Sequence, residues 1–269
     1  MHFKNMRPHD MVWSKVPPSS IVEPKKDGIR VHYYDGHFYT KRQKIVYGLT
    51  NHALALGSSQ STYKHIDCEA TVPGFDFNTA SGIIRALQHP LKYKIVLHVI
   101  DLPELGGDLL YRRAIIDSHF RKKQGLWVPM PYHIVHSSDE IKFWYHIYRG
   151  RGEEGIMIKN PHGLYVDCGN TRKSWDWQRW KPDLDFDAFI MDMEEGHGKF
   201  RGSLGVLIVK RASTGEIVRA GRGKLKDKEA DHIFRNFNSY RGRRCSILYQ
   251  RRNATGGYRH PRFDKWKCD

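Results

Sequence analysis

The most informative part of this sequence is the run Glu23-Pro24-Lys25-Lys26-Asp27-Gly28-Ile29-Arg30. Lys25 is a candidate nucleophile because it lies in a short turn crowded with positive charge. A lysine attacks only after it loses a proton, and the neighbouring cations Lys26 and Arg30 favour that loss while they attract phosphate oxygens. Gly28 permits a tight turn, and the alternating apolar residues that follow it are typical of a strand entering a core. The run therefore predicts a lysine at a strand end that attacks a nucleotide phosphate.

A Lys-x-Asp-Gly match alone is a weak signal, because charged turns before strands are common, so the rest of the chain has to decide. With 269 residues, 39% of them hydrophobic, the chain can bury a core in one large domain or two smaller ones. Lys and Arg number 45 against 29 Asp and Glu, giving a net charge of +16. Nucleic acid is the partner that fits this charge best, and an evenly solvated basic surface is the alternative.

Cysteine usage and hydropathy bear on the compartment. The four cysteines, at positions 68, 168, 245 and 268, are far apart and form no Cys-x-x-Cys pair. Free thiols in a reducing compartment are expected, rather than a zinc ribbon or a disulfide framework. The N-terminus has no apolar signal-like segment, and no stretch approaches the roughly 18 apolar residues of a membrane span. We expect a soluble, cytoplasmic protein that does not associate with membranes.

The segment Lys181-Pro182-Asp183-Leu184-Asp185 is the best candidate for a hinge, because a Trp-rich strand gives way there to an acidic, proline-containing linker. It divides the chain into residues 1–182 and 183–269. The first part has a mixed α+β pattern, and Ser137-Ser138-Asp139-Glu140 is a capping box that begins one of its helices. Strands are predicted at 29–34, 44–47, 66–72, 94–100, 133–136, 156–159 and 175–181, and helices at 79–88, 109–122 and from the capping box to about residue 148.

The second part has several short strands and one helix, which suits a small barrel. An oligonucleotide-binding barrel is the natural candidate, although an unrelated sandwich gives the same pattern. The strands are predicted at 186–193, 205–211, 217–222 and 245–250, and the helix at 227–236.

Three further segments place charged residues at spacings that suit nucleotide chemistry. His65-Ile66-Asp67-Cys68-Glu69-Ala70 puts two carboxylates on one face of a strand. Gly152-Glu153-Glu154-Gly155-Ile156-Met157-Ile158-Lys159 puts Glu154 at the head of a buried strand and Lys159 five positions on. Trp175-Asp176-Trp177-Gln178-Arg179-Trp180-Lys181-Pro182 carries two cations on one face, and these can meet one phosphate chain. A tryptophan-rich core strand with solvated charges is the alternative for this last segment.

In this order the segments resemble the motif set of the covalent nucleotidyltransferases, and above all that of small, phage-like ATP-dependent DNA ligases. The resemblance extends from the Lys-x-Asp-Gly turn through the Gly-rich run at 195–205 to Arg259-His260-Pro261-Arg262-Phe263. It implies an α+β nucleotidyltransferase (adenylation) domain with antiparallel sheets and flanking helices, followed by a small oligonucleotide-binding β-barrel.

The resemblance also implies roles for individual residues. Lys25 would form a phosphoramidate with AMP from ATP, and Glu23 would accept a hydrogen bond from the adenine amino group. A divalent metal, Mg²⁺ or Mn²⁺, would be placed by Glu154 and Glu69. The remaining implied contacts are Arg30 and Glu69 to the ribose, Arg42 near the reacting phosphate, Lys159, Arg179 and Lys181 to phosphates, and Arg172, Lys224 and Lys226 to DNA, with Arg172 at the 5′-phosphate of the nick.

The sequence departs from the family pattern at three places. Ile100 occupies the position where an aromatic ring usually stacks on the adenine, and aliphatic packing can replace that stacking at some cost in affinity. Arg179 replaces a lysine and brings a different hydrogen-bonding fork. The last family motif is abbreviated: it corresponds either to Arg262-Phe263-Asp264-Lys265 or to a register with Lys267 in place of an arginine. Loss of residues 262–269 is expected to impair self-adenylylation more than sealing by the pre-adenylylated enzyme.

These observations predict a monomeric ATP-dependent ligase, in the host cytoplasm if a phage encodes it. It would seal 5′-phosphate/3′-hydroxyl nicks in duplex DNA through a lysyl-AMP and an adenylylated DNA intermediate. The two domains would close around the DNA through the hinge near Asp183. An RNA ligase or an RNA-capping guanylyltransferase would use the same lysine chemistry, and a non-catalytic nucleic-acid binder would keep the charge alone. An NAD-dependent ligase is disfavoured because the chain shows no nicotinamide-binding segment and no zinc module.

Overall fold

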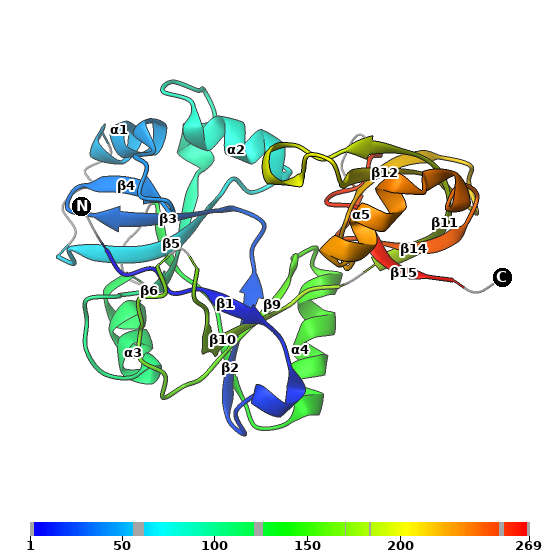
Figure 1. The fold of residues 1–269 in the computed structure, drawn as a ribbon. Coiled ribbons are helices and arrows are strands. Elements are labelled where there is room, and N and C mark those ends of the chain that lie inside the picture. Colours follow the sequence, from blue (N-terminus) through cyan, green and yellow to red (C-terminus); the bar gives the residue numbers. More distant parts are fainter. Residues whose placement is uncertain are drawn as a thin grey trace. The chain divides into compact units, whose positions relative to one another are not determined.

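The computed structural model describes residues 3–55, 62–120, 126–169, 171–182, 184–252 and 256–267. The chain forms two compact units, Met1–Lys181 and Pro182–Asp269 (Figure 1). The division falls one residue before the boundary expected from the sequence. Asp183, in the expected hinge, lies outside the described residues.

The lysine strand lies inside the first of two five-stranded sheets in the first unit, whose strand order is β1-β10-β9-β2-β8. Alternate apolar residues of its central strands, such as Ile21 and Ile156, are fully buried. The described pairings are antiparallel except for that of β1 with β10, which is parallel. The strands are β1 (Pro8–Asp10), β2 (Ser20–Lys25), β8 (His133–Val135), β9 (Gly155–Lys159) and β10 (Ser174–Trp180).

The second sheet has the order β4-β3-β5-β6-β7 and carries the largest hydrophobic cluster of the unit on one face. Its last pair, β6 with β7, is parallel. Antiparallel sheets were expected, so the parallel pair at one edge of each sheet corrects that expectation: the sheets are mixed. The strands are β3 (Ile29–Tyr34), β4 (His37–Thr40), β5 (His65–Thr71), β6 (Val96–Asp101) and β7 (Trp127–Pro129).

Four helices flank these sheets. Helices α1 and α2 pack against each other and against β4 and β5, α3 packs on β6 and β7, and α4 packs on β2 and β9 (Figure 1). The predicted capping box is confirmed at α4, where the Ser137 hydroxyl oxygen accepts from the Glu140 N–H at 3.2 Å and the Glu140 carboxylate accepts from the His136 N–H at 3.2 Å. The helices are α1 (Tyr47–Ala55), α2 (Phe77–Arg85), α3 (Leu109–Phe120) and α4 (Ser138–Gly150), with 3₁₀ turns at Trp13–Lys15 and Lys92–Lys94.

The second unit is a closed five-stranded barrel with the order β11-β12-β13-β15-β14, so the expectation of a small oligonucleotide-binding type of barrel is confirmed. Helix α5 packs against β12. The barrel encloses its own hydrophobic cluster, which includes Phe186, Ile190 and Phe263. The elements are β11 (Leu184–Glu195), β12 (Leu204–Arg211), β13 (Ile217–Gly221), α5 (Asp227–Arg235), β14 (Arg244–Tyr249) and β15 (Arg262–Trp266), with 3₁₀ turns at Gly198–Phe200 and Phe237–Ser239.

The strand expected at 44–47 is wrong. Only an isolated bridge joins Tyr39 to Ile45, and Tyr47 already belongs to α1. The Val46 carbonyl accepts from the N–H groups of Leu49 and Thr50 at 3.0 and 2.9 Å, so it begins the helix instead of a ladder. The β-branched pair Ile45-Val46 favours a strand locally, and helix initiation overrides that preference.

Cys68, Cys168 and Cys245 are buried free thiols, as expected, while Cys268 lies outside the described residues. Among the helices that the structure describes, none is both long enough and apolar enough to cross a membrane.

Candidate active site

Lys25 is the last residue of β2, so the prediction of a lysine at a strand end is confirmed. It pairs with Gly155 of β9, and its carbonyl oxygen accepts from the Glu154 N–H at 3.0 Å. The Lys25 side chain forms an ion pair with the Glu154 carboxylate. The direct partner of the Lys25 side chain is therefore a carboxylate, and not one of the neighbouring cations expected from the sequence.

Gly28 is required for packing within the protein. A Cβ at this position would collide with the carbonyl oxygen of Ala70 on β5. Its backbone dihedral φ is not positive, so it is the close approach of the turn to β5 that excludes a side chain.

A cavity of about 600 Å³ in the first unit has Lys25 in its wall. Both sheets contribute, together with the N-terminal segment and the residues after β4. The lining residues include most of those proposed from the sequence to contact the nucleotide, namely Glu23, Lys25, Arg30, Glu69, Ile100, Lys159 and Arg179. Strands far apart in the sequence therefore bring these side chains to one cavity.

Glu23 lies at a deeply buried part of the cavity wall, with a side chain only 1% exposed. Its Oε2 is 2.6 Å from Lys159 Nζ, and its Oε1 is 3.5 Å from Arg113 Nη1 of α3. Lys159 Nζ also lies 4.1 Å from the centre of the Trp177 ring. Within the described chain, Glu23 Oε1 has no hydrogen-bond donor, so this buried acceptor is left for a ligand.

Ile100 lines the cavity and packs with Met130, Trp177 and the half-buried Met157. Flat apolar surface is therefore present beside Glu23 although the residue at position 100 is aliphatic. Trp177, on β10, supplies an aromatic ring at this end of the cavity.

Arg30 is held by a bidentate ion pair to Asp67, with Nε to Oδ1 at 2.9 Å and Nη2 to Oδ2 at 2.6 Å. The Tyr165 hydroxyl donates to Asp67 Oδ2 at 2.8 Å and accepts from Arg30 Nη2 at 3.3 Å. Burial on its own raises the pKa of Asp67, but Arg30 and His32 outweigh it and hold this pKa well below its usual range. Arg30 is thus fixed in one orientation at the cavity wall.

Glu69 faces the cavity from the strand position two residues after Asp67. Burial raises the pKa of Glu69 to about 7, and the charges of Asp67 and Glu154 act in the same direction, while Lys25 and Arg30 oppose them. A carboxyl group in this state gains from any cation that enters beside it.

The two carboxylates proposed for a metal, Glu69 and Glu154, are close enough to interact electrostatically. Glu154 is bound to Lys25 and lies 4.0 Å from Lys181 Nζ, but it does not line the cavity, and neither does Lys181. In the described part of the chain, no group of three or more His, Cys, Asp or Glu side chains forms a ready metal site. Two carboxylates that complete their shell with waters and substrate phosphates are nevertheless the set that Mg²⁺ commonly uses.

Four of the residues proposed from the sequence, Arg42, Arg172, Lys224 and Lys226, are not among the lining residues of this cavity. Arg42 and Arg172 are exposed and do not line it, whereas Lys41 does. Lys224 and Lys226 belong to the barrel unit, where Lys224 forms an ion pair with Asp264.

Arg179, by contrast, lines the cavity and makes a bidentate ion pair with Asp10 of β1, with Nε to Oδ1 at 2.7 Å.

Sequence reasoning missed several wall residues: Asn5, Arg7, Lys41, Arg85 and Lys173. They come from irregular segments, or from the ends of elements, where no periodicity marks which way a side chain points. It also missed the supports of the proposed residues. Asp67 was recognised only as a carboxylate of the strand, and Arg113 and Tyr165 had no signal in the sequence.

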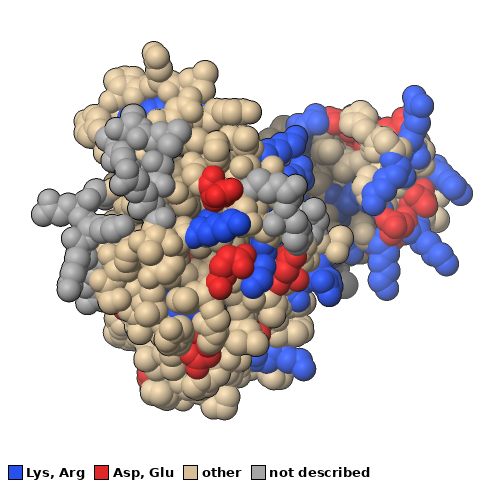
Figure 2. Space-filling model, turned by 90° about the vertical axis from the view of Figure 1, so that its left-hand side faces the viewer, with Lys and Arg blue, Asp and Glu red and all other residues tan. Residues whose placement is uncertain are grey.

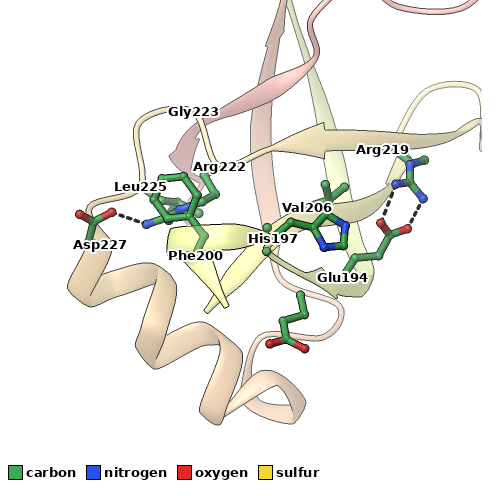
Figure 3. Close-up of a pocket in the computed structure, with 12 residues that line it drawn as sticks. Glu194, His197, Phe200, Val206, Arg219, Arg222, Gly223, Leu225 and Asp227 are labelled. Carbon is green, nitrogen blue, oxygen red and sulfur yellow. Dashed lines mark hydrogen bonds and ion pairs between the residues drawn. The ribbon is translucent and has the colours of Figure 1, made fainter. Parts of the chain in front are cut away.

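The barrel unit has a second cavity, of about 510 Å³ (Figure 3). Figure 3 shows Arg219 directed to Glu194 and Arg222 directed to Asp227, with His197 between these two pairs. Arg222 also lies over the Phe200 ring, 4.6 Å from its centre. The arginines of this cavity are therefore paired with carboxylates of the same cavity.

Charge is unevenly distributed along the chain. From residue 182 onward there are 19 Lys and Arg against 12 Asp and Glu. On the face drawn in Figure 2, acidic and basic side chains also lie side by side. Part of the basic charge is thus locally paired with carboxylates.

Comparisons with known proteins identify the family of the chain. Residues 4–181 match the family model described as the ATP dependent DNA ligase domain. The DNA ligase of Enterobacteria phage T3 is 23% identical over 75% of this chain and 71% of its own length, and that of Escherichia phage T7 is 23% identical over 74% and 71%.

Solved structures show the same fold. One described as "DNA binding with a minimal scaffold: Structure-function analysis of Lig E DNA ligases" has a TM-score of 0.80 at 17% identity and covers 99% of this chain and 100% of that chain. The ATP-dependent DNA ligase of bacteriophage T7 in complex with ATP has a TM-score of 0.54 at 19% identity, with 98% of each chain covered.

An adenylation unit with a lysine in a cation-rich cavity, joined to an oligonucleotide-binding type of barrel, defines a covalent nucleotidyltransferase. Because the family model covers more than half of its length, this chain belongs to the ATP-dependent DNA ligase family. Its activity is ATP-dependent DNA ligation, and the resemblance inferred from the sequence is confirmed.

Proposed function

We propose that this ligase seals nicks with a 5′-phosphate and a 3′-hydroxyl in duplex DNA, with Lys25 as the residue that carries AMP. The observation that supports this most directly is the position of Lys25, at a strand end in the wall of a cavity of about 600 Å³ with buried acceptors and several cations. A cavity of this size accommodates a nucleotide.

In the first step Lys25 Nζ attacks the α-phosphorus of ATP. A P–N bond forms, the bond to the bridging oxygen breaks, and pyrophosphate leaves with the electron pair. The ammonium has to lose its proton and release Glu154 before it can attack. AMP then passes to the 5′-phosphate of the nick and frees Lys25, and attack by the 3′-hydroxyl joins the strands and releases AMP.

The base and ribose would be read by the groups at the other end of the cavity. Glu23 Oε1, buried without a donor in the described chain, would accept from the adenine amino group. A guanine presents a carbonyl oxygen there, which the carboxylate repels, so ATP is preferred over GTP. Arg30 and Glu69 would contact the ribose, and Ile100 with Trp177 would pack on the base.

Phosphates would be held by Lys159, Arg179 and Lys181, and the cavity adds Arg7 and Lys41 to this set. Mg²⁺ or Mn²⁺ would be held by Glu154 and Glu69 together with substrate oxygens, and it would supply charge neutralisation on the triphosphate. Burial raises the pKa of Glu69 to about 7, and a cation bound beside this carboxyl group would lower that pKa again.

Nicked duplex DNA would contact Arg172 in the first unit and Lys224 and Lys226 in the barrel unit. The excess of basic over acidic residues from position 182 onward supports a phosphate-binding role for the barrel unit. We further propose that the protein acts as a monomer and closes on DNA through the hinge near Asp183.

The test combines self-adenylylation with labelled ATP and sealing of a nicked DNA duplex, for the wild type and Lys25→Ala. Lys142→Ala is the control, since Lys142 is a half-exposed lysine on α4, paired to Asp139, and lies outside the cavity. We expect Lys25→Ala to lose both activities by more than about a thousandfold and Lys142→Ala to keep them. Mass spectrometry of the labelled protein should place AMP on Lys25 and not on Lys26. Sealing that survives in Lys25→Ala overturns the mechanism, stronger labelling by GTP indicates a capping-type enzyme, and preferential sealing of an RNA nick indicates an RNA ligase.

A further inference from the structure

Asn5, in the N-terminal segment before β1, contributes a buried side chain to the cavity wall. The residue is only 4% exposed. Its Nδ2 donates to the Lys41 carbonyl oxygen at 3.3 Å, which fixes the amide orientation and directs Oδ1 away from that carbonyl. Within the described residues Oδ1 has no hydrogen-bond donor. A buried amide oxygen without a donor is costly unless a ligand supplies one.

The backbone of Asn5 is hydrogen-bonded through both its N–H and its carbonyl group. The Asn5 N–H donates to Asp167 Oδ1 at 3.2 Å, and the Asn5 carbonyl oxygen accepts from the Cys168 N–H at 3.1 Å. Three hydrogen bonds, counting that of Nδ2, therefore hold this residue in place before any ligand arrives. An acceptor that is fixed in advance loses little entropy on binding, so it is suited to discriminate between ligands.

The position of Asn5 in the cavity is defined by its neighbour. The Met6 N–H donates to the Tyr165 hydroxyl at 3.2 Å, and that hydroxyl donates to Asp67, the carboxylate that orients Arg30. Asn5 thus adjoins the Arg30 cluster, where the proposed function places the ribose. At that place an adenosine nucleotide offers only the 2′- and 3′-hydroxyl groups as hydrogen-bond donors, because its amino group is assigned to Glu23.

We propose that Asn5 Oδ1 accepts a hydrogen bond from a ribose hydroxyl of ATP and so selects ribonucleotides over deoxyribonucleotides. This inference rests on the proposed function, because it requires ATP to bind in this cavity and adenylylate Lys25. Asn5 would then be a specificity-determining residue from outside the sheets, and the N-terminal segment would be a third wall of the nucleotide site.

The test measures kcat/KM for self-adenylylation with ATP, 2′-deoxy-ATP and 3′-deoxy-ATP in the wild type, Asn5→Ala and Asn5→Asp. We expect the wild type to prefer ATP over one of the two deoxy analogues by about tenfold or more. Asn5→Ala should reduce that preference about tenfold by slowing the reaction with ATP, while the rate with that analogue changes little. Asn5→Asp keeps an acceptor but loses the donor to Lys41, so it should retain the preference even if its overall rate falls.

The ratio of kcat/KM for ATP to kcat/KM for a deoxy analogue separates recognition from a structural role. A loosened N-terminal segment would slow the reaction with all three nucleotides equally and leave this ratio unchanged. An active Asn5→Ala variant with the wild-type preference for both analogues overturns the inference, and so does an equal loss of rate with all three nucleotides. If the wild type forms no lysyl-AMP with any of them, the proposed function itself fails, and this inference fails with it.

Discussion

The cavities of the two units are similar in volume, about 600 and 510 Å³, yet they differ in how their polar groups are satisfied. In the first unit, buried acceptors such as Asn5 Oδ1 and Glu23 Oε1 have no donor among the described residues. In the barrel, Arg219 and Arg222 are matched by carboxylates of the same cavity. Volume and charge alone do not distinguish the two cavities. They differ in whether their buried polar atoms have a hydrogen-bond partner within the described chain.

One interaction occurs in both cavity walls and sharpens this contrast. Arg30 with Asp67 and Arg219 with Glu194 are both bidentate arginine–carboxylate pairs. The side chains of the first pair are 19% and 0% exposed, and those of the second are 64% and 39% exposed. The Arg30–Asp67 pair is therefore largely shielded from water, whereas the Arg219–Glu194 pair has the same geometry and is exposed to it.

The largest expected effect follows from breaking these two pairs. Asp67→Ala should lower the free energy of unfolding of the first unit by about 3–5 kcal/mol, because it leaves the Arg30 guanidinium buried without its counter-ion. Glu194→Ala should lower that of the barrel unit by at most about 1 kcal/mol, because water screens the exposed pair. Urea unfolding followed by tryptophan fluorescence reports mainly the first unit, since six of the seven tryptophans precede residue 182. Circular dichroism follows the unfolding of the barrel unit, which contains only one tryptophan. Similar losses in both variants would contradict the contrast.

A second effect concerns Glu69 and pH. Because its pKa is raised from 4.5 to about 7 in the folded chain, the folded state binds more protons than the unfolded state between these values. The Glu69 contribution to the free energy of unfolding therefore falls as pH rises from about 4.5 to 7, by at most about 3 kcal/mol. Glu69→Gln should gain stability relative to the wild type across this interval, as measured by unfolding at pH 5, 6, 7 and 8.

Buried histidines also make the free energy of unfolding depend on pH, so the wild type and Glu69→Gln have to be compared at each pH. Burial lowers the pKa of His32, His65 and His98 to about 4, so their contributions fall in the opposite direction, as pH decreases from about 6.5 to 4. They are present in both proteins and cancel in the difference. A difference between wild type and Glu69→Gln that does not vary with pH would refute the raised pKa.

A smaller effect distinguishes the two registers of the C-terminal motif. Deletion of residues 262–269 is a poor test, because it removes β15, which closes the barrel and carries the buried Phe263. Lys267 Nζ is 3.1 Å from Asp187 Oδ1, whereas Lys265 is exposed. An unpaired lysine is the better group for pyrophosphate. Lys265→Ala should therefore slow self-adenylylation about tenfold, with little change in sealing by pre-adenylylated enzyme, and Lys267→Ala should slow it less. The reverse order would favour the other register.

The smallest effect is expected at the barrel surface. Each lysine that contacts a DNA phosphate contributes about 0.9 to the slope of log affinity against log salt. Lys226→Ala should lower this slope by nearly that amount, and Lys224→Ala by less, because Lys224 is already paired with Asp264. DNA-binding titrations between 50 and 200 mM salt measure both slopes, and unchanged slopes would remove these lysines from the interface.

Residues on regular strands were the ones that sequence reasoning placed well. Glu23, Arg30, Glu69 and Lys159, which the family resemblance assigned to the nucleotide, all line one cavity. The capping box of α4 was also predicted correctly, because it depends on a local pattern. The local pattern of the second unit left a barrel and a sandwich open, and the family resemblance favoured the barrel that the structure shows. β2 itself was not predicted, because Pro24 is unusual in an interior strand.

The rest depended on contacts between distant residues. The partner of Lys25 lies 129 positions away, and no local pattern predicts that it is a carboxylate. Asn5 and Lys41 face the cavity from irregular segments, where dihedral angles and not periodicity decide the direction of a side chain. Arg42 was inferred from the family resemblance alone, and in the structure its neighbour Lys41 lines the cavity while Arg42 does not.

The ion pair between Lys25 and Glu154 has a consequence for the protein at rest. While this ion pair is closed, Glu154 occupies the side of the Lys25 amine that stray acylating agents or aldehydes would approach. The ligase therefore carries its nucleophile in a dormant form, protected by the partner from which it must separate before it can react.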